Sequence, residues 1–379
     1  MQPLQPVFIG AYDKGLIKNK KPFLVPDQAF SDLQNAYVWR EQVKKREGLQ
    51  LVGRLQRDLT AVLLATTIDS PGAGTITYNI FTGLGITATE PNAEIVLGSQ
   101  SNITIVIGAP GNETLTDTTG TGILTVVPGT NISSGYINYA TGVLTLVTTG
   151  AFGASSVTIT LSYYPGLPVM GILSRELEAI NQEETVFFDT KYAYRFSAGA
   201  FQEYITGTTW QGTDFDFFLG ANYRGSTPQS RAFFVTNFNN SSTTPDPIRY
   251  TLDGITWNTL DPLVDATHTL YQARIIIPYY GRLVMLNVWE GLTPPGPGTG
   301  QTNAVNIFNR CRFSQIGDPT AVDAWRSDQF GKGGFIDAPT NESIVSAIFY
   351  KNTLIVGFER STWQLRYVGE YGLPFIWER

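Results

Sequence analysis

Apolar and polar residues alternate in short runs along most of the chain, and turn-forming residues separate these runs. Residues 157–163 alternate without interruption, which predicts a half-buried strand. Residues 136–139 and 143–147 predict a hairpin, because Gly142 stands where a three-residue loop requires a left-handed residue. An isolated hairpin buries too little surface to be stable. We therefore expect the short strands of residues 59–166 to form a small β-sandwich.

Residues 167–379 contain a weaker regularity, in which pairs of adjacent aromatic residues recur. The first three pairs begin 46 residues apart, and the last interval, which contains a Gly/Pro-rich stretch at 291–301, is longer by 24. The pairs are Phe187-Phe188, Phe233-Phe234, Tyr279-Tyr280 and Phe349-Tyr350. A period of about 45 residues built from strands is typical of propeller blades. An aromatic-rich β protein also produces such pairs by chance.

Four blade-like units do not close a propeller comfortably. The chain ends soon after the predicted strands 354–358 and 363–367. We therefore expect a partial β-propeller, with more polypeptide beyond Arg379 that was lost through a cut or a truncation.

A helix is predicted in the first region, residues 1–58. Asp27 can cap its N-terminus, and Phe30, Leu33 and Tyr37 follow at three- and four-residue spacing, which places them on one face. We expect this face to pack the helix against a neighbouring protein.

A compact basic turn is predicted after the helix, at Lys44, Lys45 and Arg46. This turn can grip an acidic partner, or it can be a solvated charged turn beside an ordinary packed helix. We call residues 1–58 the arm, because we expect them to dock onto a partner. Its candidate partner-docking residues are Phe23, Pro26, Asp27, Phe30, Leu33, Tyr37, Lys44, Lys45 and Arg46.

Composition and charge support three regions, 1–58, 59–166 and 167–379. The chain is 42% apolar and 15% charged, and it is rich in Thr, Gly, Asn, Tyr and Phe, which favours strands and turns. Its net charge of −6 is unevenly distributed, because residues 1–57 carry ten Lys and Arg against five Asp and Glu, whereas residues 58–174 have no Lys or Arg. Stationary DNA binding requires a clustered basic surface, which the acidic remainder does not offer. A conduit that DNA slides past is compatible with such a surface.

Most catalytic chemistry is poorly supported. The chain has one histidine, His268, and one cysteine, Cys311, which we interpret as packing or surface residues. Residues 331–334 (Gly-Lys-Gly-Gly) lack the Ser/Thr and the helix that follow the lysine of a phosphate-binding loop, and residues 83–85 lack the third glycine of a dinucleotide site. We expect no catalytic residue, no metal site and no cofactor, and we predict that the protein is not an enzyme.

One pair of carboxylates keeps other possibilities open. Asp214 and Asp216 alternate with phenylalanine in residues 213–217, which places both on one face of a predicted strand. Paired carboxylates can hydrolyse glycosides or bind Ca²⁺. Alternation of Asp with Phe is also typical of a strand with one solvated face.

No signal peptide or membrane span is predicted. The first ten residues lack a basic stretch and an apolar run, and no apolar segment approaches the roughly 18 residues that span a bilayer. The Asn-x-Ser/Thr sequences at Asn102, Asn112 and Asn131 are expected by chance in a Thr-rich chain. We expect synthesis in the cytosol.

Two stretches resemble a known family. They contain Gly15-Leu16, Pro22-Phe23, Pro26-Asp27-Gln28, Leu33, Asn35-Ala36-Tyr37 and Lys45-Arg46-Glu47-Gly48, and then Asn309-Arg310-Cys311-Arg312-Phe313-Ser314, Asp318-Pro319, Trp325 and residues 344–367. In these loose motifs the chain resembles the tail nozzle proteins of short-tailed bacteriophages, including the muzzle proteins of crAss-like phages. The hairpin at 135–146 is similar to small β-domains inserted in many phage tail and baseplate proteins. The chain departs from the family in ending before a full propeller and in its insert without Lys or Arg.

The resemblance implies a structural component of the virion tail that is made in the host cytoplasm. It implies a ring, usually a homo-hexamer, below the portal and adaptor rings, with propellers around the DNA exit channel. The implied partners are adaptor and other ring proteins, fibre proteins, the C-terminal remainder of the same polypeptide, and genomic DNA that passes without sequence-specific binding. The alternative function is a carbohydrate-binding propeller or tail-spike module that recognises the host surface through exposed Trp and Tyr residues. A propeller glycosidase that relies on Asp214 and Asp216 is the third hypothesis.

Overall fold

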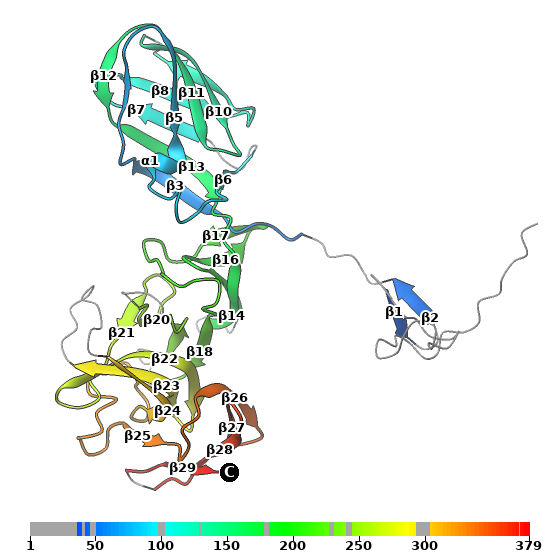
Figure 1. Cartoon of the computed structure of the whole chain (residues 1–379), viewed down its shortest axis with the longest axis vertical. Helices are drawn as coiled ribbons and strands as arrows, with labels where there is room; N and C mark the ends of the chain where they lie inside the picture. The colour runs from blue at the N-terminus through cyan, green and yellow to red at the C-terminus, as the bar shows by residue number, and fades with distance from the viewer. Residues whose placement is uncertain are drawn as a thin grey trace, which may run out of the picture. The chain divides into compact units, whose positions relative to one another are not determined.

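The protein is almost entirely β, and its chain divides into two compact units, Met1–Gly53 and Arg54–Arg379 (Figure 1). The computed structural model describes residues 36–39, 42–45, 51–97, 103–128, 130–177, 182–226, 231–239, 245–292, 304–370 and 372–379.

The described part of the first unit is an antiparallel strand pair, β1 (Ala36–Trp39) and β2 (Gln42–Lys45). The predicted helix is therefore wrong at its C-terminal end, because Tyr37 lies in β1. The sequence Ala-Tyr-Val-Trp is rich in strand-favouring residues, and pairing with β2 satisfies its backbone.

The predicted basic turn is also corrected. Lys44 and Lys45 lie in strand β2, and Lys44 pairs with Tyr37. Arg46 and the remainder of the predicted helix, including Asp27, Phe30 and Leu33, lie outside the described residues.

The second unit begins with one curled sheet of nine strands around one core. Its strands in spatial order are β3 (Arg57–Leu63), β13 (Val157–Tyr164), β7 (Ile103–Ile107), β8 (Glu113–Asp117), β9 (Ile123–Val127), β10 (Ile132–Asn138), β11 (Val143–Thr148) and β5 (Gly74–Asn79), with β6 (Glu94–Ile95) beside β13. Strands at the centre of the sheet turn alternate residues inward, as Ile103, Ile105 and Ile107 of β7 do. The β-sandwich prediction thus corresponds to a single sheet that curls over its own core.

Local sequence signals in this curled sheet are confirmed. β13 is the predicted alternating strand, and β10 and β11 form the predicted hairpin, in which Asn138 pairs with Val143. The loop between them has four residues, 139–142, one more than predicted, and Gly142 has the expected positive φ, +64°. A two-stranded sheet of β4 (Ile68–Ser70) and β12 (Phe152–Ser155) completes the domain.

The described residues contain one short α-helix, α1 (Ile80–Gly83), which begins where Asn79 accepts a hydrogen bond from the Thr82 amide. In this part of the chain, no helix is long and apolar enough to cross a membrane.

Four antiparallel four-stranded sheets follow, and we call them blades 1 to 4. Blade 1 contains β14 (Val169–Leu177), β15 (Gln182–Asp189), β16 (Ala193–Ser197) and β17 (Ala200–Glu203); blade 2 contains β18 (Leu219–Tyr223), β19 (Ala232–Thr236), β20 (Ile248–Thr251) and β21 (Asn258–Leu260). Blade 3 contains β22 (His268–Tyr279), β23 (Arg282–Leu292), β24 (Val305–Phe313) and β25 (Gly334–Asp337); blade 4 contains β26 (Ile344–Tyr350), β27 (Thr353–Phe358), β28 (Thr362–Tyr367) and β29 (Phe375–Glu378). These meanders form a partial β-propeller, and the first strands of consecutive blades contact one another.

Consecutive blades share apolar cores. Phe188 of blade 1 packs in one core with Phe233 of blade 2, while the next core joins Phe234 of blade 2 to Met285 of blade 3. A third core joins blades 3 and 4. Strand β23 therefore has a continuous buried run over residues 283–288, because both faces of its sheet are covered.

The blade repeat is longer than the aromatic pairs predicted. The first strands of blades 1 to 3 begin at residues 169, 219 and 268, which are 50 and 49 residues apart. Phe187-Phe188 and Phe233-Phe234 lie in the second strand of their blades, whereas Tyr279-Tyr280 ends a first strand, so the third pair is not equivalent. The last interval is lengthened by the long connection between β24 and β25 as well as by the region of residues 293–303.

Candidate functional site

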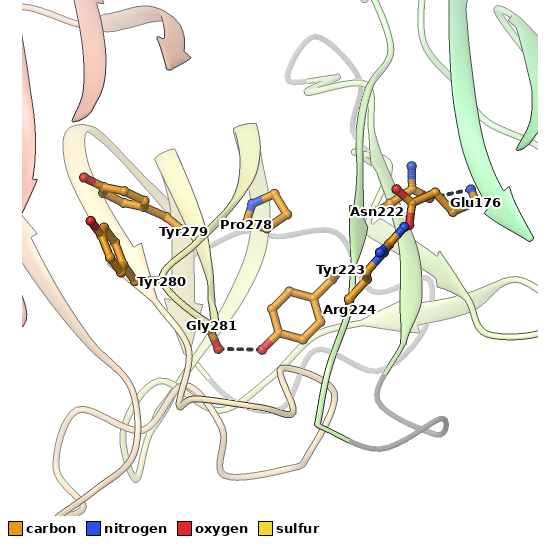
Figure 2. A pocket seen from close by; sticks show the side chains of 8 residues that line it. All are labelled: Glu176, Asn222, Tyr223, Arg224, Pro278, Tyr279, Tyr280 and Gly281. Carbon is orange, nitrogen blue, oxygen red and sulfur yellow. Dashed lines mark hydrogen bonds and ion pairs between the residues drawn. The ribbon is translucent and has the colours of Figure 1, made fainter. Parts of the chain in front are cut away.

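An open pocket of about 280 Å³ lies beside the first strands of blades 1, 2 and 3 (Figure 2). Its walls come from the end of β14, the end of β18 and the turn between β22 and β23. They are formed by Glu176, Asn222, Tyr223, Arg224, Pro278, Tyr279, Tyr280 and Gly281.

Two of these residues hold the strands together. The Asn222 side chain accepts a hydrogen bond from the Glu176 amide (3.0 Å) and donates one to the Ser174 carbonyl (2.7 Å), which ties β18 to β14. The Tyr223 hydroxyl donates to the Gly281 carbonyl (2.7 Å) and accepts from the Gly317 amide (3.1 Å). Their polar atoms are thus committed to the walls of the pocket.

The two charged residues of the pocket, Arg224 and Glu176, pair with each other. Arg224 Nε donates to Glu176 Oε2 at 2.6 Å, and this hydrogen bond raises the pKa of the Arg224 guanidinium. The side chain of Arg224 is 75% exposed and that of Glu176 is 35% exposed. Tyr280 lies on the opposite side of the pocket (Figure 2). Its ring stacks on that of Tyr367 with centroids 4.1 Å apart.

The turn that carries Tyr280 is tight. Tyr280 and Gly281 have φ values of +47° and +70°, which is the backbone of a two-residue hairpin loop between Tyr279 and Arg282. This conformation costs strain at Tyr280, so the stacking on Tyr367 helps to hold the ring at the edge of the pocket.

The sequence prediction missed this pocket. Glu176 and Arg224 are 48 residues apart, close to the 49- and 50-residue spacing of the blades. Residues one blade apart on first strands lie side by side, so an accurate period would have pointed to this pair. The aromatic pairs gave a shorter period and concealed it.

A second polar cluster joins the curled sheet to blade 1. Arg57 of β3 makes two hydrogen bonds to Glu203 of β17 and one to the Tyr163 hydroxyl (2.9 Å). Its guanidinium carbon also lies 3.8 Å from the centroid of the Tyr192 ring. We call this cluster the junction, and its hydrogen-bonded charges are largely shielded from solvent.

Two carboxylates complete the junction. Glu90 is buried and accepts hydrogen bonds from Lys191 Nζ (3.0 Å) and from the Tyr192 hydroxyl (2.7 Å). Asp189 is also buried and accepts from the Tyr194 hydroxyl and from the amides of Lys191 and Tyr192. Burial raises the pKa of Asp189 to about 6, although these hydrogen bonds act in the opposite direction.

The carboxylates considered for catalysis do not lie on a strand. Asp214 and Asp216 lie in a loop, and Asp216 Oδ2 accepts hydrogen bonds from the amide and hydroxyl of Thr213. The predicted strand is wrong because these local hydrogen bonds close a turn. Phe215 and Phe217 are 83% and 65% exposed, so the segment has no buried face.

The remaining motif residues have structural surroundings. Cys311 is buried in the core shared by blades 3 and 4, and burial raises the pKa of its thiol. His268 hydrogen-bonds Asp265 at the start of β22. The glycine-rich residues 331–334 lead into strand β25, whereas a phosphate-binding loop leads into a helix.

The docking residues predicted in the arm are only partly described. Tyr37, Lys44 and Lys45 lie in the β1–β2 pair, whereas Phe23, Pro26, Asp27, Phe30, Leu33 and Arg46 lie outside the described residues. Their docking role stays a prediction.

Within the described ranges, no group of three or more His, Cys, Asp or Glu residues is placed to hold a metal ion. Comparison with known proteins found no protein-family model that matches the chain and no curated protein with a significantly similar sequence. A functional assignment therefore has to rest on the geometry of the blades, the junction and the pocket.

Proposed function

We propose that this protein is a structural subunit of a virion tail, of the nozzle or muzzle type, whose blades form part of the wall of a DNA exit channel. In this proposal it has no catalytic role. It assembles as a ring and contacts adaptor and fibre proteins.

The observation that carries the proposal is the series of blades joined by shared cores. Each blade buries apolar side chains against the next, and Arg57 fixes the curled sheet to blade 1 through Glu203. Such continuous packing supports a rigid wall element, because close-packed cores transmit force with little deformation.

Charge supports the same proposal. The chain has 26 Lys and Arg residues, of which ten lie in residues 1–57, and 32 Asp and Glu residues, of which five lie there. Residues 58–379 therefore carry 16 cationic and 27 anionic residues. A surface of this balance does not retain phosphates, and DNA can pass it.

Electron microscopy of the purified particle is the direct test. Density for this chain in a ring on the tail axis would support the proposal. A position in a peripheral fibre would refute it.

The basic residues of the arm allow a second test. Reversal of Lys44, Lys45 and Arg46 to glutamate should reduce incorporation into particles, while the isolated protein unfolds at the same temperature as the wild type. The matched control reverses Lys351, Arg360 and Arg366, three exposed cations of blade 4. Equal incorporation of both triple variants would contradict docking through the arm.

A further inference from the structure

The polar atoms that line the pocket beside the first strands differ in whether they already hydrogen-bond to other protein groups. Asn222 and Tyr223 use theirs to bind backbone groups of neighbouring segments. Within the described residues, the Nη atoms of Arg224, Oε1 of Glu176 and the hydroxyl of Tyr280 make no hydrogen bond to protein. These atoms are left to bind a ligand or water.

The two charges that line the pocket, on Arg224 and Glu176, balance each other. Arg224 and Glu176 are joined by a hydrogen bond of 2.6 Å, and no other charged side chain lines the pocket. An anion would meet the Glu176 carboxylate, and a cation would meet the guanidinium. A neutral ligand that both accepts from Arg224 and donates to Glu176 satisfies the pair without repulsion.

The opposite wall consists of ring surfaces, with the Tyr280 hydroxyl as a polar group. The Pro278 ring and the Tyr280 ring lie across the pocket from the ion pair (Figure 2). Tyr280 is 48% exposed, and its stacking on Tyr367 fixes its orientation. A ligand with hydroxyl groups on one edge and C–H groups on a face matches this division.

The volume of the pocket limits the size of the ligand. A volume of about 280 Å³ lies just below the range of roughly 300–1,000 Å³ that holds drug-sized ligands, so the pocket suits a single ring. Its openness to solvent allows the ring to belong to a longer chain.

We propose that this pocket binds one neutral pyranose unit of a glycan, with its hydroxyl groups on Arg224 and Glu176 and its C–H face against Pro278 and Tyr280. This binding site does not depend on the tail-nozzle proposal. A ring on the tail axis and a glycan site at the ends of the first strands are compatible.

The test uses the full chain on an array of neutral glycans, with glycans that contain uronic or sialic acid for comparison. Ligand-observed NMR with the methyl glycosides of glucose, galactose, mannose and N-acetylglucosamine then measures affinity for a single ring. We expect binding to neutral glycans. Binding to acidic glycans alone, or to none of these probes, would overturn the proposal.

Two variants examine the ion pair. Arg224→Ala should weaken the binding of neutral glycans at least about tenfold, since a hydrogen bond to a charged group contributes this much or more. Glu176→Gln leaves the Arg224 charge unbalanced, so this variant should lose affinity for neutral glycans and gain affinity for acidic ones. A loss caused by misfolding would not produce that gain.

The matched control is Arg54→Ala, which removes an exposed arginine paired with Glu94 on the curled sheet. It should bind as the wild type does. If Arg224→Ala binds neutral glycans as tightly as this control, the pocket is not the site.

Discussion

Arg57 and Glu203 lie 146 residues apart in the chain and form a bidentate pair, with Nε–Oε2 and Nη2–Oε1 distances of 2.9 and 3.2 Å. Only 16% of the Arg57 side chain and 6% of the Glu203 side chain are exposed. A planar guanidinium fixes the orientation of a carboxylate as well as its position. The pair therefore sets the angle between β3 of the curled sheet and β17 of blade 1.

Arg57→Ala should destabilise the fold by about 3–5 kcal/mol, because it leaves the Glu203 carboxylate and the Tyr163 hydroxyl without their partner in a shielded site. Denaturant unfolding at pH 7 measures the change. Arg54→Ala removes the exposed pair with Glu94 and should cost less than about 1 kcal/mol. Similar costs for the two variants would show that the junction contributes no more than a surface pair.

Asp189 should make stability fall as pH rises. Its pKa in the fold is about 6, above the ordinary aspartate value of 3.8, so the folded state holds the proton more tightly than the unfolded state. The stabilising contribution is complete below about pH 4 and is lost as pH rises through 6, with a magnitude on the order of 3 kcal/mol.

Asp189→Asn isolates this contribution, because asparagine stays neutral and can still accept hydrogen bonds from the amides of Lys191 and Tyr192. The variant should be more stable than the wild type at pH 8 and nearly equal at pH 4, as measured by urea unfolding. Asp214→Asn, in an exposed loop, is the control and should follow the wild type. A wild type that gains stability between pH 5 and 7 relative to Asp189→Asn would contradict the assignment.

Phe188→Ala should cost about 3–5 kcal/mol. The Phe188 ring is fully buried between blades 1 and 2, where it stacks on Phe218 and meets the edge of Trp210. Phe215→Ala, at an exposed position three residues before Phe218, should change stability by less than about 0.5 kcal/mol. Thermal and denaturant unfolding of the two variants compares them directly, and equal losses would refute a core shared between the blades.

Gly142→Ala should destabilise the curled sheet by more than about 1 kcal/mol. Its φ of +64° disfavours any side chain, and an added Cβ would lie 2.7 Å from the Phe81 ring. Gly72→Ala, where no atom lies within 4 Å of an added Cβ, is the matched control and should be nearly neutral. A neutral Gly142→Ala variant would show that the loop adjusts freely.

Local signals predicted the strands well. The alternation in β13, the glycine of the β10–β11 loop and the hairpin of β27 and β28 are all encoded within a few residues. Where two local signals competed, the prediction was wrong, as at Tyr37, whose helical spacing coexists with a strand-favouring sequence.

The junction and the pocket depend on contacts that no local pattern encodes. In the sequence, Arg57 is one of ten cations in a basic region, and its pairing with Glu203 follows only from the position of β3 beside β17. Glu176 and Arg224 are ordinary surface charges until the blade spacing is known. Composition indicated few catalytic groups, but it carried no information about which charged residues would meet.

The shared cores also determine the order in which the blades unfold locally. Blade 3 is covered on both faces, whereas blade 4 shares a core with blade 3 alone among the described residues, and Ile348 on its other face is 70% exposed. In a linear array each unit is held by the cores that it shares with its neighbours, so a unit that shares one core opens at a lower free energy than a unit that shares two. Amide protons of β27 and β28 should therefore exchange with solvent before those of β22 and β23. Among the described blades, local unfolding should begin in blade 4, because Arg57 holds blade 1 to the curled sheet.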